Sequence, residues 1–224
     1  MRERLFRFKQ FSVSHSASAM KVGTDGVTLG AWAACAGRVL DVGCGCGLIG
    51  LMCAQRGASE VTMVEIDPAA AQEAAQNAAK SPWADRVTTV CDDFLTAPLQ
   101  GDFDAIVSNP PFFANGELAP DRRRADARHE SGLTPDAFMA RAAELLAPDG
   151  TVSVILPPDR AEEWTAAATF HGLRQRRLAR LYTGAAEPRR VLVEFGAPSS
   201  LEVSELHINS PEYQEIVKDF YLNP

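Results

Sequence analysis

The sequence predicts an α/β fold: a mostly parallel, seven-stranded sheet with helices on both faces and an antiparallel hairpin at one edge. Short apolar runs alternate with helical stretches through the middle of the chain, and strands joined in this way form parallel sheets through right-handed crossovers. A glycine-rich turn separates the first of these strands from its helix. Two late apolar runs follow one another without a helix between them, which indicates the hairpin.

Each predicted element rests on apolar periodicity and on its flanking residues. Pro68 and Pro135 are predicted at first helical positions, where the missing N–H of proline leaves no hydrogen bond unmade. The predicted strands are 38–42, 60–64, 87–90, 103–107, 151–156, 173–181 and 190–195. The predicted helices are 48–55, 68–80, 135–146 and 160–170.

The chain has 224 residues, of which 46% are hydrophobic and 23% charged, as in ordinary globular proteins. We expect a single domain with an N-terminal arm and helix (1–34), a core (35–197) and a C-terminal extension (198–224). No apolar run reaches a membrane-spanning length, and the basic N-terminus lacks the apolar core of a secretory signal. The five cysteines show no disulfide or zinc spacing, so we expect reduced thiols and a cytoplasmic protein. We also expect a monomer without a membrane partner.

Basic residues gather in two segments, although the net charge of the chain is -7. Residues 1–21 hold five basic side chains against one glutamate, and residues 174–190 hold six arginines against one glutamate. Arginine makes planar, bidentate contacts with phosphate and stacks on bases. The two segments are therefore either phosphate-binding surfaces or the solvated faces of an acidic protein.

An acid at the end of the first strand of the core is followed by three glycines, in the order Asp41, Gly43, Gly45 and Gly47. The glycines allow a tight turn and a close approach of a ligand to the backbone. The pattern alone is weak evidence, because many α/β nucleotide folds contain one. Asp41 narrows the choice of ligand. The Asp41 carboxylate would repel a pyrophosphate, but it would attract a ligand that carries an ammonium group beside a carboxylate.

Acidic residues also end the next two strands. Glu65 is placed to accept hydrogen bonds from both hydroxyls of a ribose. Asp92 or Asp93 is placed to hold an adenine amino group, with Phe94 lining the ring, and the position of the strand end favours Asp93. A single acid at a strand end is usually part of a turn or a helix cap. Three in succession, at the edge where open α/β sheets bind ligands, indicate a binding site.

These residues resemble the cofactor site of the S-adenosylmethionine-dependent methyltransferases with a Rossmann-like (class I) fold. The resemblance implies S-adenosylmethionine as the cofactor, held by Asp41, by the glycine turn, by Glu65 and by residues 92–94. It implies no metal, and the four histidines are dispersed along the chain.

The residues Asn109, Pro110, Pro111 and Phe112 follow the fourth strand. They resemble the Asn-Pro-Pro-Tyr motif of methyltransferases that modify planar amino or amide nitrogens, and the resemblance also places Asn109 against the cofactor. Because the lone pair of such a nitrogen is delocalised, acceptors on Asn109 and Pro110 would pull the amine toward tetrahedral geometry. Phe112 stands where tyrosine is usual and would stack on a flipped base. The alternative is a turn that only leads out of the strand.

The N-terminal segment resembles the start of the bacterial tRNA1(Val) adenine-N6-methyltransferases, which act on adenosine 37 beside the anticodon. The resemblance rests on Phe8-Lys-Gln-Phe11 and Lys21-Val-Gly-Thr-Asp-Gly26, and it continues to about Leu222. It implies that the methionine end of the cofactor is held by Gly23, Thr24 and Asp25, with Lys21 nearby.

The long connection at 115–132 follows the Asn109 motif directly and carries Arg122, Arg123, Arg128 and His129. A loop of this length in a compact domain is usually functional, although the alternative is a merely disordered excursion. The resemblance implies that these side chains hold the anticodon arm of the tRNA beside Asn109.

The sequence therefore favours an enzyme that methylates N6 of adenosine in tRNA by direct in-line transfer from S-adenosylmethionine. Two other interpretations stay open. A protein glutamine N5-methyltransferase faces the same delocalised lone pair, but such enzymes usually carry a helical N-terminal domain, for which the 40 residues before Asp41 leave no room. A non-catalytic RNA-binding module on the same fold is opposed by the intact acids and by Asn109.

Overall fold

The computed structural model of the chain describes residues 5–18, 21–111 and 133–222. The β-strands in these residues are β1 (Leu5–Arg7), β2 (Ser12–Ser14), β3 (Arg38–Val42), β4 (Glu60–Glu65), β5 (Val87–Cys91), β6 (Phe103–Ser108), β7 (Leu146–Leu156), β8 (Arg174–Tyr182), β9 (Arg190–Gly196) and β10 (Glu202–His207). The helices are α1 (Thr24–Trp32), α2 (Leu48–Gln55), α3 (Pro68–Ala79), α5 (Pro135–Leu145), α6 (Ala161–Phe170) and α7 (Pro211–Val217), with a 3-10 turn at Pro158–Arg160.

Proline and a capping side chain begin the two helices for which the sequence predicts this start. The Asp67 carboxylate accepts hydrogen bonds from the N–H groups of Ala69 and Ala70, and Pro68 is the first residue of α3. Thr134 caps α5 in the same way, directly before Pro135. Both caps satisfy N–H groups that have no partner within the helix.

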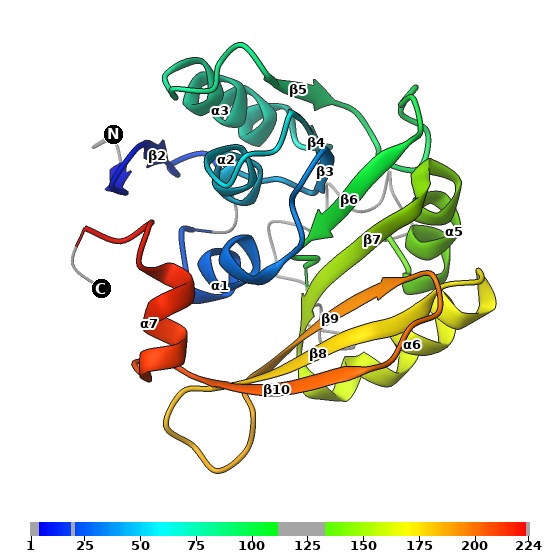
Figure 1. Cartoon of the computed structure of the whole chain (residues 1–224). Helices are drawn as coiled ribbons and strands as arrows, with labels where there is room; N and C mark the ends of the chain where they lie inside the picture. Colours follow the sequence, from blue (N-terminus) through cyan, green and yellow to red (C-terminus); the bar gives the residue numbers. More distant parts are fainter. Residues whose placement is uncertain (1–4, 19–20, 112–132, 223–224) are drawn as a thin grey trace, which may run out of the picture.

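The main sheet has eight strands in the order β10-β8-β9-β7-β6-β3-β4-β5 (Figure 1). Strands β3 to β7 run parallel to one another, whereas β9 is antiparallel to both β7 and β8. The predicted α/β class, the mostly parallel sheet and the late antiparallel pair are therefore confirmed. A separate two-stranded sheet pairs β1 with β2.

The sheet has one strand more than the seven that the sequence predicts. Strand β10 pairs with β8 in parallel and occupies the edge, so the β8–β9 hairpin lies one strand further in. Among the residues of β10 only Leu206 is buried, and charged side chains interrupt its apolar pattern. An edge strand of this composition gives little hydrophobic signal, although the charges protect the edge from pairing with another chain.

The sheet separates two hydrophobic cores, and successive residues of its central strands point to opposite faces. In β3, Val39 belongs to the core beneath α1, α2, α3 and α7, whereas Leu40 belongs to the core beneath α5 and α6. In β6, Val107 and Ile106 divide in the same way. This division confirms the expected layers of helices on both faces (Figure 1).

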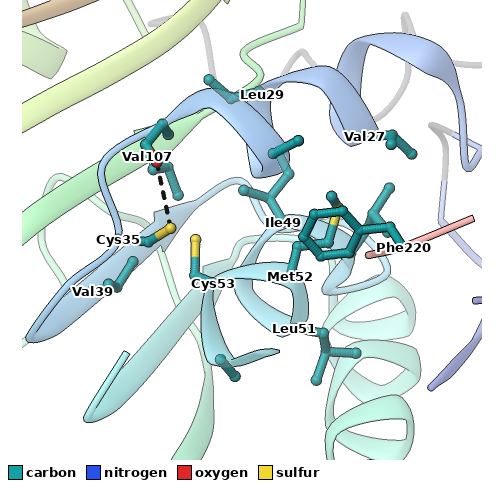
Figure 2. Packing of buried hydrophobic residues seen from close by; sticks show 14 of the residues in the cluster. Val27, Leu29, Cys35, Val39, Ile49, Leu51, Met52, Cys53, Val107 and Phe220 are labelled. Atoms are coloured by element: carbon teal, nitrogen blue, oxygen red, sulfur yellow. Dashed lines mark hydrogen bonds between the residues drawn. The ribbon is translucent and has the colours of Figure 1, made fainter. Parts of the chain in front are cut away.

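Figure 2 shows part of the first of these cores, in which α1 packs on α2 and the side chains of Leu29, Ile49 and Met52 are buried. Gly30 permits the close approach, because a Cβ at this position would lie 2.7 Å from the Met52 sulfur. Four of the five cysteines are buried in this core as small apolar residues, namely Cys35, Cys44, Cys46 and Cys53. The fifth, Cys91, is exposed.

The two ends of the described chain meet beside α2. The N–H of Lys9 donates to the carbonyl of Phe220 at 2.8 Å, and the rings of Phe8 and Tyr221 lie 6.1 Å apart. Gln55 of α2 donates to the carbonyl of Asp219 at 2.8 Å. The segment after α7 therefore holds the β1–β2 hairpin in place. None of the helices within the described residues is long and apolar enough to cross a membrane.

Candidate active site

Asp41 lies at the carboxyl end of β3 and is completely buried. Its Oδ2 accepts a hydrogen bond of 2.8 Å from the N–H of Gly50 in α2, whereas no donor in residues 5–18, 21–111 and 133–222 reaches Oδ1. Burial raises the pKa of Asp41 to about 7; the Gly50 hydrogen bond lowers it and the Glu65 carboxylate raises it. A buried carboxylate oxygen without a donor suits a ligand that brings one.

The glycine turn after β3 adopts backbone conformations that other residues rarely reach. Gly43, Gly45 and Gly47 have φ values of 67°, 56° and 80°, and α2 begins directly after Gly47. Such a turn exposes backbone N–H groups at the start of a helix, where they can face a ligand. The three predicted glycine positions are therefore required by the backbone itself.

Glu65 ends β4 and is held against this turn. Its Oε2 accepts a hydrogen bond of 2.8 Å from the N–H of Gly45, and its Oε1 accepts one of 2.9 Å from the N–H of Asp67. Each oxygen retains a further lone pair, so the carboxylate is oriented but still able to accept from hydroxyl groups. The next residue, Ile66, is 48% exposed at the same edge, and sequence reasoning did not single it out.

The acids after β5 lie beside Glu65, because the N–H of Asp92 donates to the Glu65 carbonyl at 3.1 Å. Asp92 accepts from the N–H of Asp93 at 2.8 Å, and Asp93 accepts from the N–H of Leu95 at 2.9 Å. Both side chains are half-buried and shape the turn. Phe94 is buried in the core, with its ring centroid 5.3 Å from that of Phe138, so it supports the edge from below.

The residues after β6 stand next to the end of β3. Ser108 donates to the carbonyl of Val42 at 2.8 Å, which fixes the start of the motif. The side-chain oxygen of Asn109 is buried, and it has no hydrogen-bond partner in the described part of the chain. Pro110 is buried and Pro111 is exposed. The other predicted substrate residues lie outside the described residues: Phe112, Arg122, Arg123, Arg128 and His129.

The N-terminal motif is engaged in internal contacts. The Lys21 ammonium group donates to the carbonyls of His15 and Ser18 at 3.0 and 2.9 Å. Gly23 precedes α1, and its carbonyl accepts the N–H of Val27. The first turn of α1 holds Thr24 and Asp25. Sequence reasoning did not foresee that Lys21 closes a loop of the backbone.

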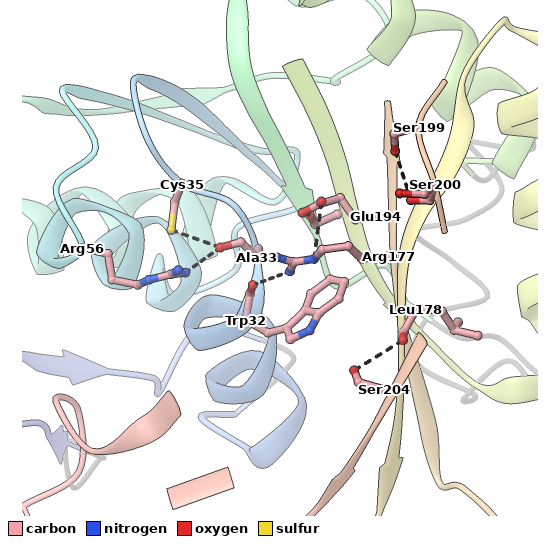
Figure 3. A network of polar contacts seen from close by, with 11 residues as sticks. Trp32, Ala33, Cys35, Arg56, Arg177, Leu178, Glu194, Ser199, Ser200 and Ser204 are labelled. Atoms are coloured by element: carbon pink, nitrogen blue, oxygen red, sulfur yellow. Dashed lines mark hydrogen bonds and ion pairs between the residues drawn. The ribbon is translucent and has the colours of Figure 1, made fainter. Parts of the chain in front are cut away.

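Part of the predicted basic segment at 174–190 faces the fold. The Arg177 guanidinium lies 4.1 Å above the Trp32 ring, donates to the Trp32 carbonyl and pairs with Glu194 (Figure 3). Arg190 forms an ion pair of 2.8 Å with Asp25. These two arginines hold α1 against β8 and β9. This part of the basic segment is therefore neither a phosphate-binding surface nor a solvated face, which were the two interpretations drawn from charge alone.

Comparison with known proteins places the chain in one family. The methyltransferase small domain family matches residues 29–175. A tRNA1(Val) (adenine(37)-N6)-methyltransferase of Bacteroides thetaiotaomicron is 42% identical over 230 residues, which cover 97% of each chain.

Two solved structures share the fold at low sequence identity. A predicted O-methyltransferase from Agrobacterium tumefaciens has a TM-score of 0.65 at 19% identity, covering 88% of this chain and 96% of its own. A TehB-like SAM-dependent methyltransferase from Corynebacterium glutamicum has a TM-score of 0.53 at 20% identity, covering 80% and 90%.

Proposed function

The chain belongs to the methyltransferase small domain family, together with the tRNA1(Val) (adenine(37)-N6)-methyltransferases, and from this premise we propose that it methylates N6 of adenosine in tRNA. The observation that carries the proposal is the place of Asn109. Its buried side-chain oxygen has no partner among the described residues and follows β6, next to the end of β3 where Asp41 lies.

The residues at this edge fit S-adenosylmethionine. Asp41 offers an unsatisfied carboxylate oxygen to an ammonium group, the glycine turn offers close backbone approach, and Glu65 offers oriented acceptors to a ribose. Asp93, or else Asp92, offers an acceptor to the adenine amino group, and Gly23, Thr24 and Asp25 complete the predicted set. The cofactor supplies a methyl group on a positively charged sulfur.

Asn109 and Pro110 prepare the nitrogen that receives the methyl group. The Asn109 side-chain oxygen and the Pro110 carbonyl accept the two N–H hydrogens of the exocyclic amine, so the lone pair is drawn out of the ring. The two prolines restrict the backbone, which positions both acceptors before the substrate arrives. The methylated nitrogen then loses a proton to water, so no strong base is needed.

The substrate side of the proposal concerns residues 112–132. Phe112 stacks on the flipped base, and Arg122, Arg123, Arg128 and His129 contact the anticodon arm. The proposed target is adenosine 37 of tRNA1(Val), which is named in the relative from Bacteroides thetaiotaomicron. We place the protein in the cytoplasm, where its tRNA is found, and expect it to act as a monomer.

A transfer assay tests this function. Labelled S-adenosylmethionine is incubated with unmodified total tRNA and, separately, with a protein extract, and the products are digested and identified. N6-methyladenosine in one tRNA is the expected result. Label in glutamine of a protein would instead support the amide methyltransferase, and no label despite cofactor binding would support the non-catalytic RNA-binding module.

The variant Asn109→Ala separates catalysis from binding. We expect kcat to fall about 100-fold or more, because one acceptor for the amine is lost at the reacting atom. Affinity for S-adenosylhomocysteine, measured by calorimetry, should stay within about fivefold, since the other predicted contacts remain. A variant that transfers methyl groups at the wild-type rate would disprove the role of Asn109.

A further inference from the structure

Helix α3 carries two buried polar residues on a face otherwise made of alanine. Glu73 is 7% exposed and Asn77 is 2% exposed, and they lie one turn apart. Ala70, Ala74 and Ala78 are buried on the same helix. Since alanine is short, another segment of backbone can approach this face closely, and buried polar side chains there require partners.

The partner of Glu73 is the backbone at residues 14–18, which we call the arch. The Glu73 carboxylate accepts hydrogen bonds from three successive N–H groups, those of Ser16, Ala17 and Ser18, at 2.6, 3.1 and 2.9 Å. It also accepts from the Ser14 hydroxyl at 3.1 Å. One side chain thus binds three successive backbone donors and one hydroxyl of the arch.

Lys21 completes this arrangement from the carbonyl side. Its ammonium group lies within hydrogen-bond distance of the carbonyls of His15, Ser16 and Ser18, at 3.0, 3.4 and 2.9 Å. Three N–H groups of the arch are therefore directed to an anion, and three of its carbonyls are directed to a cation. Charged hydrogen bonds of this kind are stronger than neutral ones and define one conformation.

The arch lies against the glycine turn of the candidate active site. Asn77 donates to the carbonyls of both Ser14 and Cys46 at 2.8 Å, and so links the arch to the turn. A Cβ at Gly45 would lie 2.9 Å from the Ser18 hydroxyl oxygen. Gly45 itself donates to Glu65, the predicted ribose acceptor.

We propose that Glu73 is a positioning residue for the cofactor site, which holds the arch against the glycine turn and thereby sets the affinity for the cofactor. The chain passes from the arch to Gly23 and the start of α1 within a few residues, so the arch also determines where the predicted N-terminal contacts begin. The inference rests on the proposed function, because it takes S-adenosylmethionine as the ligand of this edge.

The carboxylate form of Glu73 is maintained by the arch. Burial raises the pKa of Glu73, but the hydrogen bonds from Ser18, Ala17, Ser16 and Ser14 outweigh it and leave the pKa below its ordinary value. Glutamine at this position has only one side-chain oxygen, and its NH₂ group cannot accept a hydrogen bond. It would therefore lose some of the hydrogen bonds that the N–H groups of the arch donate to Glu73.

The test compares Glu73→Gln with Glu194→Gln. Glu194 is a matched control because it is 4% exposed and paired with Arg177 on β8, away from the glycine turn. Calorimetry measures the Kd of S-adenosylhomocysteine, and a labelled-methyl assay measures KM for cofactor and for tRNA. We expect Glu73→Gln to raise Kd and cofactor KM about tenfold, with kcat and the tRNA KM within about twofold.

In Glu194→Gln the Kd of S-adenosylhomocysteine should stay within about twofold of the wild-type value, although the Tm of this variant should fall because a buried ion pair is lost. Glu73→Asp keeps the charge but shortens the reach, so its Kd should lie between those of wild type and Glu73→Gln. If Glu73→Gln does not fold, Asn77→Ala takes its place, since alanine preserves the helix and removes the link to Cys46.

A Tm loss in Glu73→Gln without a change in Kd would overturn the positioning role and leave a purely structural one. A wild-type protein that does not bind S-adenosylhomocysteine would overturn the cofactor assignment itself. The two failures are therefore distinguishable.

Discussion

The two layers of helices cover the sheet with different kinds of side chain. The layer of α1, α2 and α3 contains buried polar groups that make specific hydrogen bonds, such as Asp41 at the end of β3 and Glu73 and Asn77 on α3. Beneath α5 and α6 lie stacked aromatic rings, with Phe138 packed between Phe94 and Trp164 at 5.3 and 5.1 Å. Both layers bury apolar side chains, but only the first also positions the predicted ligand-binding atoms, so a loss of stability in the second layer should leave affinity unchanged.

The largest expected effect comes from the aromatic layer. Phe195 of β9 is fully buried there, at the end of the strand that lies away from the candidate site. Phe195→Ala should lower the free energy of unfolding by about 3–5 kcal/mol, because it leaves a cavity in a packed core. Urea unfolding measures the loss, and calorimetry should give a Kd for S-adenosylhomocysteine within about twofold of wild type. A large change in Kd would show that the two layers are coupled.

A substitution of Asp41 tests whether the buried polar groups in the layer of α1, α2 and α3 control affinity for the cofactor. Asp41→Asn preserves the shape of the side chain and the hydrogen bond from Gly50 but removes the charge offered to a ligand ammonium group. A hydrogen bond to a charged group contributes about 1.5–3 kcal/mol, so the Kd of S-adenosylhomocysteine should rise about 10- to 100-fold. An unchanged Kd would remove Asp41 from the cofactor site.

The same carboxylate makes the ligand-free protein sensitive to pH. Burial raises the pKa of Asp41 from 3.8 to about 7, so between these values the native state binds more protons than the unfolded state. Stability should therefore fall as pH rises through this window, by at most about 4 kcal/mol from this group. Unfolding in urea at about pH 5 and about pH 8 should show a smaller fall in Asp41→Asn than in wild type.

The architecture could be predicted because its central strands are buried on both faces. Segments such as 38–42 and 103–107 are short and mostly apolar, and proline and capping residues mark the starts of α3 and α5. Strand β10 could not be predicted in this way, since Leu206 is its only buried residue. Its pairing depends on β8 offering a free edge, which is a property of the assembled sheet.

The glycine turn, Asp41, Glu65 and Asn109 could be singled out because residue type and strand order coincide at one edge. Glu73 and Asn77 could not, although Asn77 contacts the same turn and Glu73 holds the arch that lies against it. Their partners lie more than 30 residues away in sequence, and within α3 they look like polar residues of an exposed helix face. Only the packing of the arch on α3 reveals that this face is buried.

The smallest expected effect comes from a buried polar pair in the layer of α1, α2, α3 and α7 that lies away from the candidate site. The Thr28 hydroxyl of α1 and the Tyr213 hydroxyl of α7 are buried and 3.0 Å apart, and neither touches the glycine turn. Thr28→Val preserves the shape but leaves the Tyr213 hydroxyl without this partner, so the free energy of unfolding should fall by about 1 kcal/mol. The Kd of S-adenosylhomocysteine should not change, because only polar groups linked to the turn control affinity. A tenfold rise in Kd would mean that the polar layer acts as a single unit, in which any lost hydrogen bond shifts the site.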